Sequence, residues 1–224
     1  MLDPKVPMLT PELGERLVSK DYKQDFRERE ALIHDGASWK LERRQYFEEQ
    51  NDPSRDALTR GDWSEVLRLF AADRDIVLAD AQKDQSRRYI FHRVRIVEYP
   101  ITPYVQWELH WLHQHADLGA SRVRIVTADR VSNAEKEQQL PEILVVGSRT
   151  LYNTLYSDSG RPLGAIRYTD QQQVDAWEHY ITSLYEVGED IAPYFAREIA
   201  HLPAPPAVPS PSPSLSSSPL PRPE

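Results

Sequence analysis

The sequence contains no cysteine, and this absence excludes two structural features. Without thiols the chain has neither a disulfide framework nor a zinc site built on thiolates. The nucleophile motif G-x-S-x-G, the Walker loop and the dinucleotide fingerprint are missing as well. The sequence therefore provides no nucleophile to assign as catalytic, and we expect no cofactor.

Long apolar runs are also missing. The amino-terminal stretch MLDPKVPMLTPELG has no apolar core of the kind that a signal peptide needs. No segment approaches the roughly 20 apolar residues that a membrane-spanning helix requires. We therefore expect a cytoplasmic protein without a membrane partner.

The sequence has fewer basic side chains than acidic ones. The 224 residues include 35 acidic and 27 basic side chains, so the net charge is −8. An acidic chain repels phosphate overall and would need a locally basic face to bind nucleic acid, so we do not expect direct nucleic-acid binding. Hydrophobic residues make up 40% of the chain, which is enough for a sizeable core.

Proline is concentrated at the carboxyl end. The run LPAPPAVPSPSPSLSSSPLPRPE follows His201 and cannot form a packed core, because proline removes a backbone donor and serine adds no apolar surface. A Pro-rich docking segment is the alternative. We divide the chain into an N-terminal helical segment (1–36), an α+β domain (37–201) and a disordered Pro/Ser-rich tail (202–224).

Hydrophobic periodicity predicts alternating helices and strands. The predicted helices span about 11–34, a segment capped by Asp62, a segment after Pro103, about 170–188 and about 189–200. The predicted strands lie around Trp39 and Leu41 and at 89–99, 122–127, 142–147, 150–156 and 163–169. This order favours an α+β fold with a mixed sheet of about five or six strands, packed by helices.

The segment RVRIV occurs twice, at 93–97 and 122–126, with a predicted helix between the copies. A strand, a crossover helix and a second strand form one βαβ unit with parallel strands. If the two strands are neighbours with matching orientation, Arg93, Arg95, Arg122 and Arg124 line one surface that suits an anion or an acidic partner. We favour the alternative, in which these arginines pair with the chain's own acidic side chains.

Three histidines lie within the segment ELHWLHQHADLG. Helical geometry places His110 and His113 on a sector that they share with two glutamines, which indicates a solvated face. His115 lies on the opposite side of the helix, beside Glu108, Tyr104 and Trp111. The three imidazoles cannot converge on one ion, and the H-E-x-x-H arrangement is absent, so we expect no metal.

The central region contains the segment RVRIVEYPITPYVQWE and the hairpin SDSGRPLG. Through these motifs the chain resembles, over roughly residues 20–195, the actinobacterial domain-of-unknown-function family 6879. The matching positions are Arg93, Val94, Arg95, Pro100, Thr102, Tyr104, Trp107, Glu108, Gly119, Gly160, Arg161, Pro162 and Gly164. The chain departs from the family where it has ILVVGS in place of F-W-L-F-D-D/S.

The resemblance implies an accessory protein of gene cassettes that encode helix-turn-helix regulators. We therefore favour a non-catalytic regulatory or interaction protein that acts with such a regulator or with a small ligand. The alternatives are an enzyme that uses Glu108, His115 or Asp129 as acid–base groups, and a catalytically dead phospholipase-D-like domain without the H-x-K motif. The candidate ligand or partner face comprises Arg93, Arg95, Tyr104, Trp107, Glu108, His115, Arg122 and Arg124.

Overall fold

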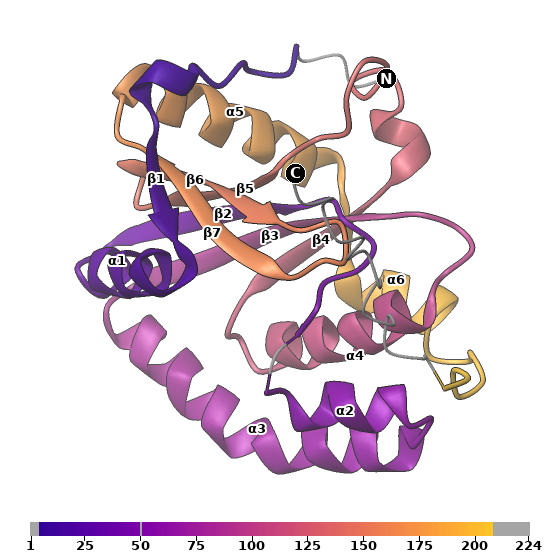
Figure 1. The fold of residues 1–224 in the computed structure, drawn as a ribbon. Helices are drawn as coiled ribbons and strands as arrows, with labels where there is room; N and C mark the ends of the chain where they lie inside the picture. Colours follow the sequence, from indigo (N-terminus) through magenta and orange to yellow (C-terminus); the bar gives the residue numbers. More distant parts are fainter. Residues whose placement is uncertain (1–4, 50, 208–224) are drawn as a thin grey trace, which may run out of the picture.

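The computed structural model describes residues 5–49 and 51–207, and its centre is one mixed sheet of eight strands (Figure 1). The spatial order is β1-β7-β6-β5-β2-β3-β4-β8. Strands β2, β3 and β4 are parallel, and the other neighbours are antiparallel. The strands are β1 (Glu15–Val18), β2 (Gly36–Glu42), β3 (Tyr89–Val97), β4 (Arg122–Thr127), β5 (Glu142–Val146), β6 (Thr150–Tyr156), β7 (Pro162–Tyr168) and β8 (Glu189–Asp190).

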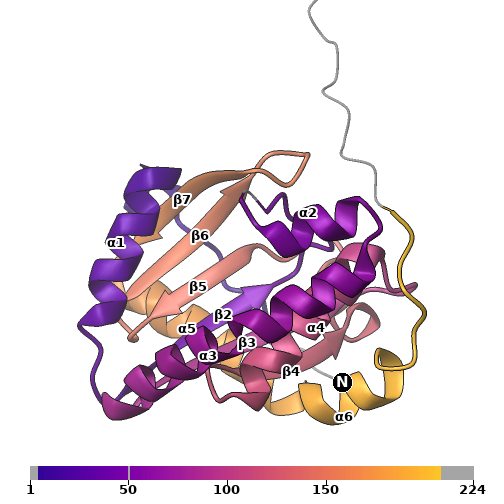
Figure 2. The ribbon, with the colours of Figure 1, turned by 90° about the horizontal axis from the view of Figure 1, so that it is seen from below.

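Helices cover both faces of the sheet. They are α1 (Ser19–Ala31), α2 (Pro53–Thr59), α3 (Trp63–Ser86), α4 (Pro103–Asp117), α5 (Gln171–Val187) and α6 (Ile191–Glu198), with 3-10 turns η1 (Pro11–Leu13) and η2 (Ala128–Val131). Helix α5 lies alone on one face, and the other five helices lie on the opposite face (Figures 1 and 2). None of the helices in the described part of the chain has the length and apolar character needed to cross a bilayer.

The predicted α+β class and the βαβ unit are confirmed. Strands β3 and β4 are parallel neighbours, and α4 connects them. Helix α4 begins where the sequence indicates, because Pro103 occupies its first turn and the Thr102 hydroxyl accepts a hydrogen bond from the Val105 N–H at 3.2 Å. The sheet has two strands more than the predicted maximum of six, namely β1 and β8.

The prediction of one helix from Pro11 to His34 is wrong in its first part. After η1 the chain forms β1, which pairs antiparallel with β7. Gly164 in β7 has φ +128°, and a Cβ at this position would lie 2.0 Å from the Leu17 carbonyl oxygen. Glycine at this position therefore lets β1 approach β7 closely. The helix begins only at Ser19, because pairing with a distant strand overrides the local preference.

The first residues of the predicted tail pack on the domain. Pro205 is buried, and the Gln106 side chain on α4 donates a hydrogen bond to the Pro203 carbonyl at 3.0 Å. From residue 208 onward, the predicted disordered tail lies outside the described residues.

Candidate functional site

The two RVRIV strands are offset by one residue in the sheet. Arg93 lies opposite Val123 in the register, and Arg124 lies opposite Val94. Residues that lie opposite each other point to the same face, so the offset sends the two arginine pairs to opposite faces. Arg93 and Arg95 face α4, whereas Arg122 and Arg124 lie on the α5 side. The prediction that the four arginines line one surface, made for the case that the two strands are neighbours with matching orientation, is therefore wrong.

Arg95 is at the centre of a buried charge cluster on the α4 face. Its side chain is fully buried, and Nη2 lies 2.6 Å from Oε2 of Glu108 on α4. Nε donates a hydrogen bond to the same oxygen at 2.8 Å, and Nη1 donates one to the Ile96 carbonyl at 2.9 Å. This geometry satisfies most of the guanidinium within the protein. Arg95 is therefore an internal connector between β3 and α4.

Glu42, the last residue of β2, completes this cluster. It lies opposite Arg95 in the register, and its Oε1 accepts a hydrogen bond from Arg93 Nη1 at 2.9 Å and forms an ion pair with Lys40. Burial opposes ionisation of Glu42, but Lys40, Arg93 and Arg95 together lower its pKa to about 2. Burial raises the pKa of Glu108 to about 7, against the attraction of Arg95. The two carboxyl groups that flank Arg95 therefore differ strongly in proton affinity.

Trp107 and Tyr104 pack inside the protein next to this cluster. Trp107 is 4% exposed, and its indole N–H donates to the Ser54 hydroxyl on α2 at 3.0 Å. Tyr104 is 3% exposed, and its hydroxyl donates to Glu49 at 3.1 Å. These two hydrogen bonds connect α4 to α2 and to the segment that precedes α2. Four of the eight predicted face residues, Arg95, Tyr104, Trp107 and Glu108, are thus buried.

A second charge cluster, which the sequence prediction missed, lies where β2 and β3 end. Arg43 is 4% exposed, and its guanidinium pairs with Glu98 at 2.5 Å and with Glu135 at 2.6 Å. The buried Glu142 carboxylate accepts hydrogen bonds from the backbone N–H groups of Arg43 and Arg44 at 2.8 and 2.6 Å. The members of this cluster come from segments that are distant in the sequence.

The predicted solvated face of α4 is wrong, because α6 packs on it. The His113 ring stacks on Phe195 with centroids 4.1 Å apart, and His110 meets the same phenyl ring edge-on at 4.8 Å. Burial lowers the pKa of both imidazoles, that of His110 to about 4. Within the described residues, no group of three or more His, Cys, Asp and Glu side chains is placed to hold a metal ion.

His115, Glu108 and Asp129 do not form one acid–base site. The His115 ring packs on Trp111 at 3.8 Å, and burial, with Arg93 nearby, lowers its pKa to about 4. Glu108 is buried against Arg95, and Asp129 is exposed in η2 beyond β4. The three side chains thus have separate surroundings.

Arg122 and Arg124 remain accessible. Arg122 is exposed and Arg124 half-buried, and Arg124 Cζ lies 5.3 Å from the ring centroid of Tyr185 on α5. Among the residues that the structure describes, neither guanidinium forms an ion pair with a carboxylate, in contrast to Arg93. Both arginines line a hollow of about 420 Å³ that also includes His113 and Tyr185. Of the predicted face, Arg122 is exposed, whereas Arg93, His115 and Arg124 are half-buried.

The chain has also been compared with curated proteins and with protein-family models. No curated protein matches the chain. A family model described as "Domain of unknown function (DUF6879)" matches residues 25–196, which include the whole of β2 to α5 and both charge clusters. The match covers most of the chain and agrees with the resemblance that the sequence motifs indicate. The chain therefore belongs to the DUF6879 family.

Proposed function

We propose that this protein is a non-catalytic regulatory protein that acts by binding a transcriptional regulator or a small ligand. The observation that carries the proposal is the internal pairing of the family-motif charges. Arg95 and Glu108 pair with each other at 2.6 Å in the protein interior, so they stabilise the fold and do not face a substrate. We infer that function depends on residues outside this pair.

Arg122 and Arg124 support a binding role. A guanidinium presents several N–H donors in a planar arrangement that matches carboxylate and phosphate groups. In the described residues these two donors have no carboxylate partner and border a hollow. An acidic segment of a partner protein, or an anionic small molecule, would complete their hydrogen bonds.

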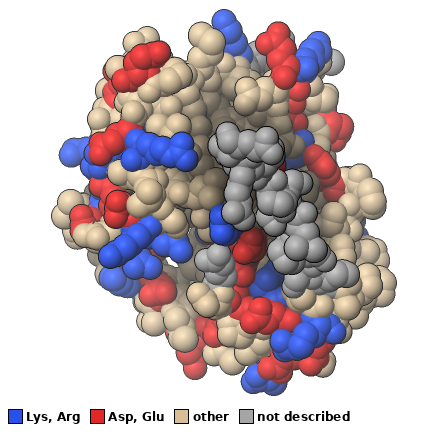
Figure 3. All heavy atoms as spheres, viewed as in Figure 1, with Lys and Arg blue, Asp and Glu red and all other residues tan. Residues whose placement is uncertain are grey.

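A protein partner fits the charge of this chain better than DNA does. The net charge is −8, and acidic and basic side chains are interspersed on the face shown in Figure 3. Such a face has no extended positive field to attract phosphate. The family resemblance implies a helix-turn-helix regulator, which would supply the DNA contact itself.

The test is co-purification with the helix-turn-helix regulator encoded beside this chain's gene. We expect the two purified proteins to co-elute in size-exclusion chromatography and a deletion strain to show altered expression of the regulator's targets. The double variant Arg122→Glu/Arg124→Glu should weaken co-elution by charge reversal. Arg16→Glu, at an exposed arginine on β1, is the matched control and should co-elute like the wild type. Separate elution combined with unchanged expression in the deletion strain would refute the proposal.

A further inference from the structure

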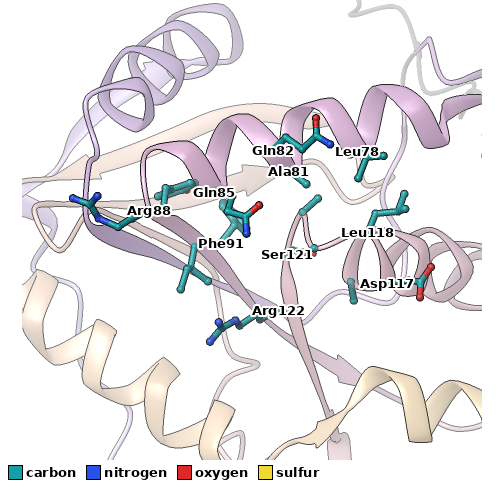
Figure 4. Close-up of a pocket in the computed structure, with 15 residues that line it drawn as sticks. Leu78, Ala81, Gln82, Gln85, Arg88, Phe91, Asp117, Leu118, Ser121 and Arg122 are labelled. Carbon is teal, nitrogen blue, oxygen red and sulfur yellow. The ribbon is translucent and has the colours of Figure 1, made fainter.

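A hollow of about 710 Å³ lies at the amino ends of β3 and β4. Residues of α3 form one side of this cavity, and the end of α4 with the start of β4 forms the other side (Figure 4). After Phe70, helix α3 buries only Val77 and Ala81, although it continues to Ser86. The second half of α3 therefore packs sparsely and leaves the cavity between itself and α4.

The lining combines apolar surface with a few polar groups. Leu78, Ala81, Phe91 and Leu118 supply the apolar part. Gln82, Gln85 and Arg122 are among the polar residues of the lining. Cavities of this size with a few polar groups on an apolar lining are typical of small-molecule sites.

Charge in the cavity centres on Arg122. The other arginine of the lining, Arg88, is occupied by its ion pair with Asp35. The Asp117 carboxylate lies 3.6 Å from Arg74, which offsets its negative charge. Arg122 has no carboxylate partner among the described residues and lines both this cavity and the 420 Å³ hollow beside it. It is therefore the free donor that a ligand in the cavity would meet.

We propose that this cavity binds an organic anion with an apolar body, such as an aryl sulfonate or a medium-chain carboxylate. The anionic group pairs with Arg122, and the apolar body packs against Leu78, Ala81 and Phe91. The inference deepens the small-ligand part of the proposed function and rests on it. Its test uses the isolated chain, so a failure to bind the regulator and a failure to bind the anion are separate results.

The probe is 1-anilinonaphthalene-8-sulfonate, titrated into the full chain and followed by its fluorescence. We expect saturable binding at one site per chain. Arg122→Gln should weaken binding about tenfold or more, because it removes a charge-assisted hydrogen bond. Decanoate should displace the probe at lower concentration than 1-decanol, which has a similar apolar body without the charge.

Two pairs of matched variants locate the site. Gln82→Trp should block the cavity from α3 and abolish binding, whereas Lys83→Trp, at the exposed neighbour outside the lining, should not. Arg16→Gln is the control for loss of an exposed arginine and should keep wild-type affinity. Non-saturable binding by the wild type, or equal affinities of the wild type, Arg122→Gln and Gln82→Trp, would overturn the proposal. Thermal unfolding of each variant establishes that it is folded before the titration.

Discussion

Arg95 on β3 and Glu108 on α4 form a buried ion pair, with 2.6 Å between Nη2 and Oε2. The pair joins a strand of the βαβ unit to its own crossover helix, thirteen residues further along the chain. Glu42 from β2 approaches the same guanidinium and contributes to the raised pKa of Arg95. This relationship explains why both residues match the family motif although neither faces solvent: they fix the position of α4 over the sheet.

Replacing Arg95 by methionine should destabilise the protein by about 3–5 kcal/mol, because Glu42 and Glu108 would remain buried without their shared counter-charge. Urea denaturation monitored by circular dichroism measures this change. The double variant Arg95→Met/Glu108→Leu should recover much of the loss, because an apolar pair often replaces a buried ion pair without cost. A double variant that is less stable than Arg95→Met would contradict this account.

Glu108→Gln should change the pH dependence of stability. In the folded chain the pKa of Glu108 is about 7 against an ordinary value of 4.5, so the folded state holds the proton more tightly than the unfolded state. The wild type therefore loses stability from this group as pH rises from 4.5 through 7. Relative to the wild type, Glu108→Gln should gain on the order of 3 kcal/mol between pH 4.5 and 8, measured by urea unfolding.

Glu42→Gln should show the opposite sign. Lys40, Arg93 and Arg95 lower the pKa of Glu42 to about 2, although burial opposes this, so the ionised carboxylate stabilises the folded state above pH 4.5. That contribution is lost as pH falls toward 2. The variant should be less stable than the wild type at pH 7, and the difference should shrink between pH 5 and 3. The same trend with pH in both glutamine variants would contradict the assigned environments.

His110→Phe should make the protein more tolerant of acid. Burial, with His113 nearby, lowers the pKa of His110 to about 4, so the unfolded chain takes up this proton first and stability falls as pH drops from 6.5 to 4. Phenylalanine keeps the edge-on packing against Trp63 and Phe195 but does not titrate. Melting temperatures at pH 7 and pH 5 should differ less in the variant. His201→Phe, at an exposed histidine, is the control and should behave like the wild type.

Gly164→Ala should detach or distort β1. The new Cβ would lie 2.0 Å from the Leu17 carbonyl oxygen, and φ is +128°. We expect a loss of about 2 kcal/mol or more. Gly119→Ala is the matched control: φ is +80°, but nothing lies within 4 Å of the added Cβ, so the loss should be about 1 kcal/mol. Faster hydrogen exchange across the β1–β7 pair in Gly164→Ala alone would locate the damage.

The sequence predicted those helices and strands that are indicated by hydrophobic periodicity and capping residues within their own segment. Strands β4 and β6 have the predicted bounds, and α3 begins after Asp62, whose carboxylate accepts from the Glu65 N–H at 3.0 Å. Short elements were missed. Helix α2 has seven residues and β8 only two, which is too short for a periodic signal. Strand β1 was predicted as helix because its partner β7 is about 150 residues away.

The site was less predictable, because it depends on register and on packing between distant segments. Both RVRIV strands were located correctly, but the one-residue offset that sends Arg93 and Arg122 to opposite faces belongs to the pairing between the strands, which neither strand's own pattern specifies. The solvated face of α4 was predicted from the helix alone, and Phe195 on α6 covers it. A helical projection gives the direction of a side chain but does not identify its neighbour.

The most direct test of the central claim compares a core variant and a surface variant in one binding measurement. Isothermal titration calorimetry would measure the affinity of the proposed helix-turn-helix partner for each protein. We predict that Arg95→Met/Glu108→Leu, once shown to be folded, keeps the wild-type affinity, whereas Arg122→Glu/Arg124→Glu loses it. The reverse result, a folded core variant that no longer binds and a surface variant that binds normally, would contradict the account.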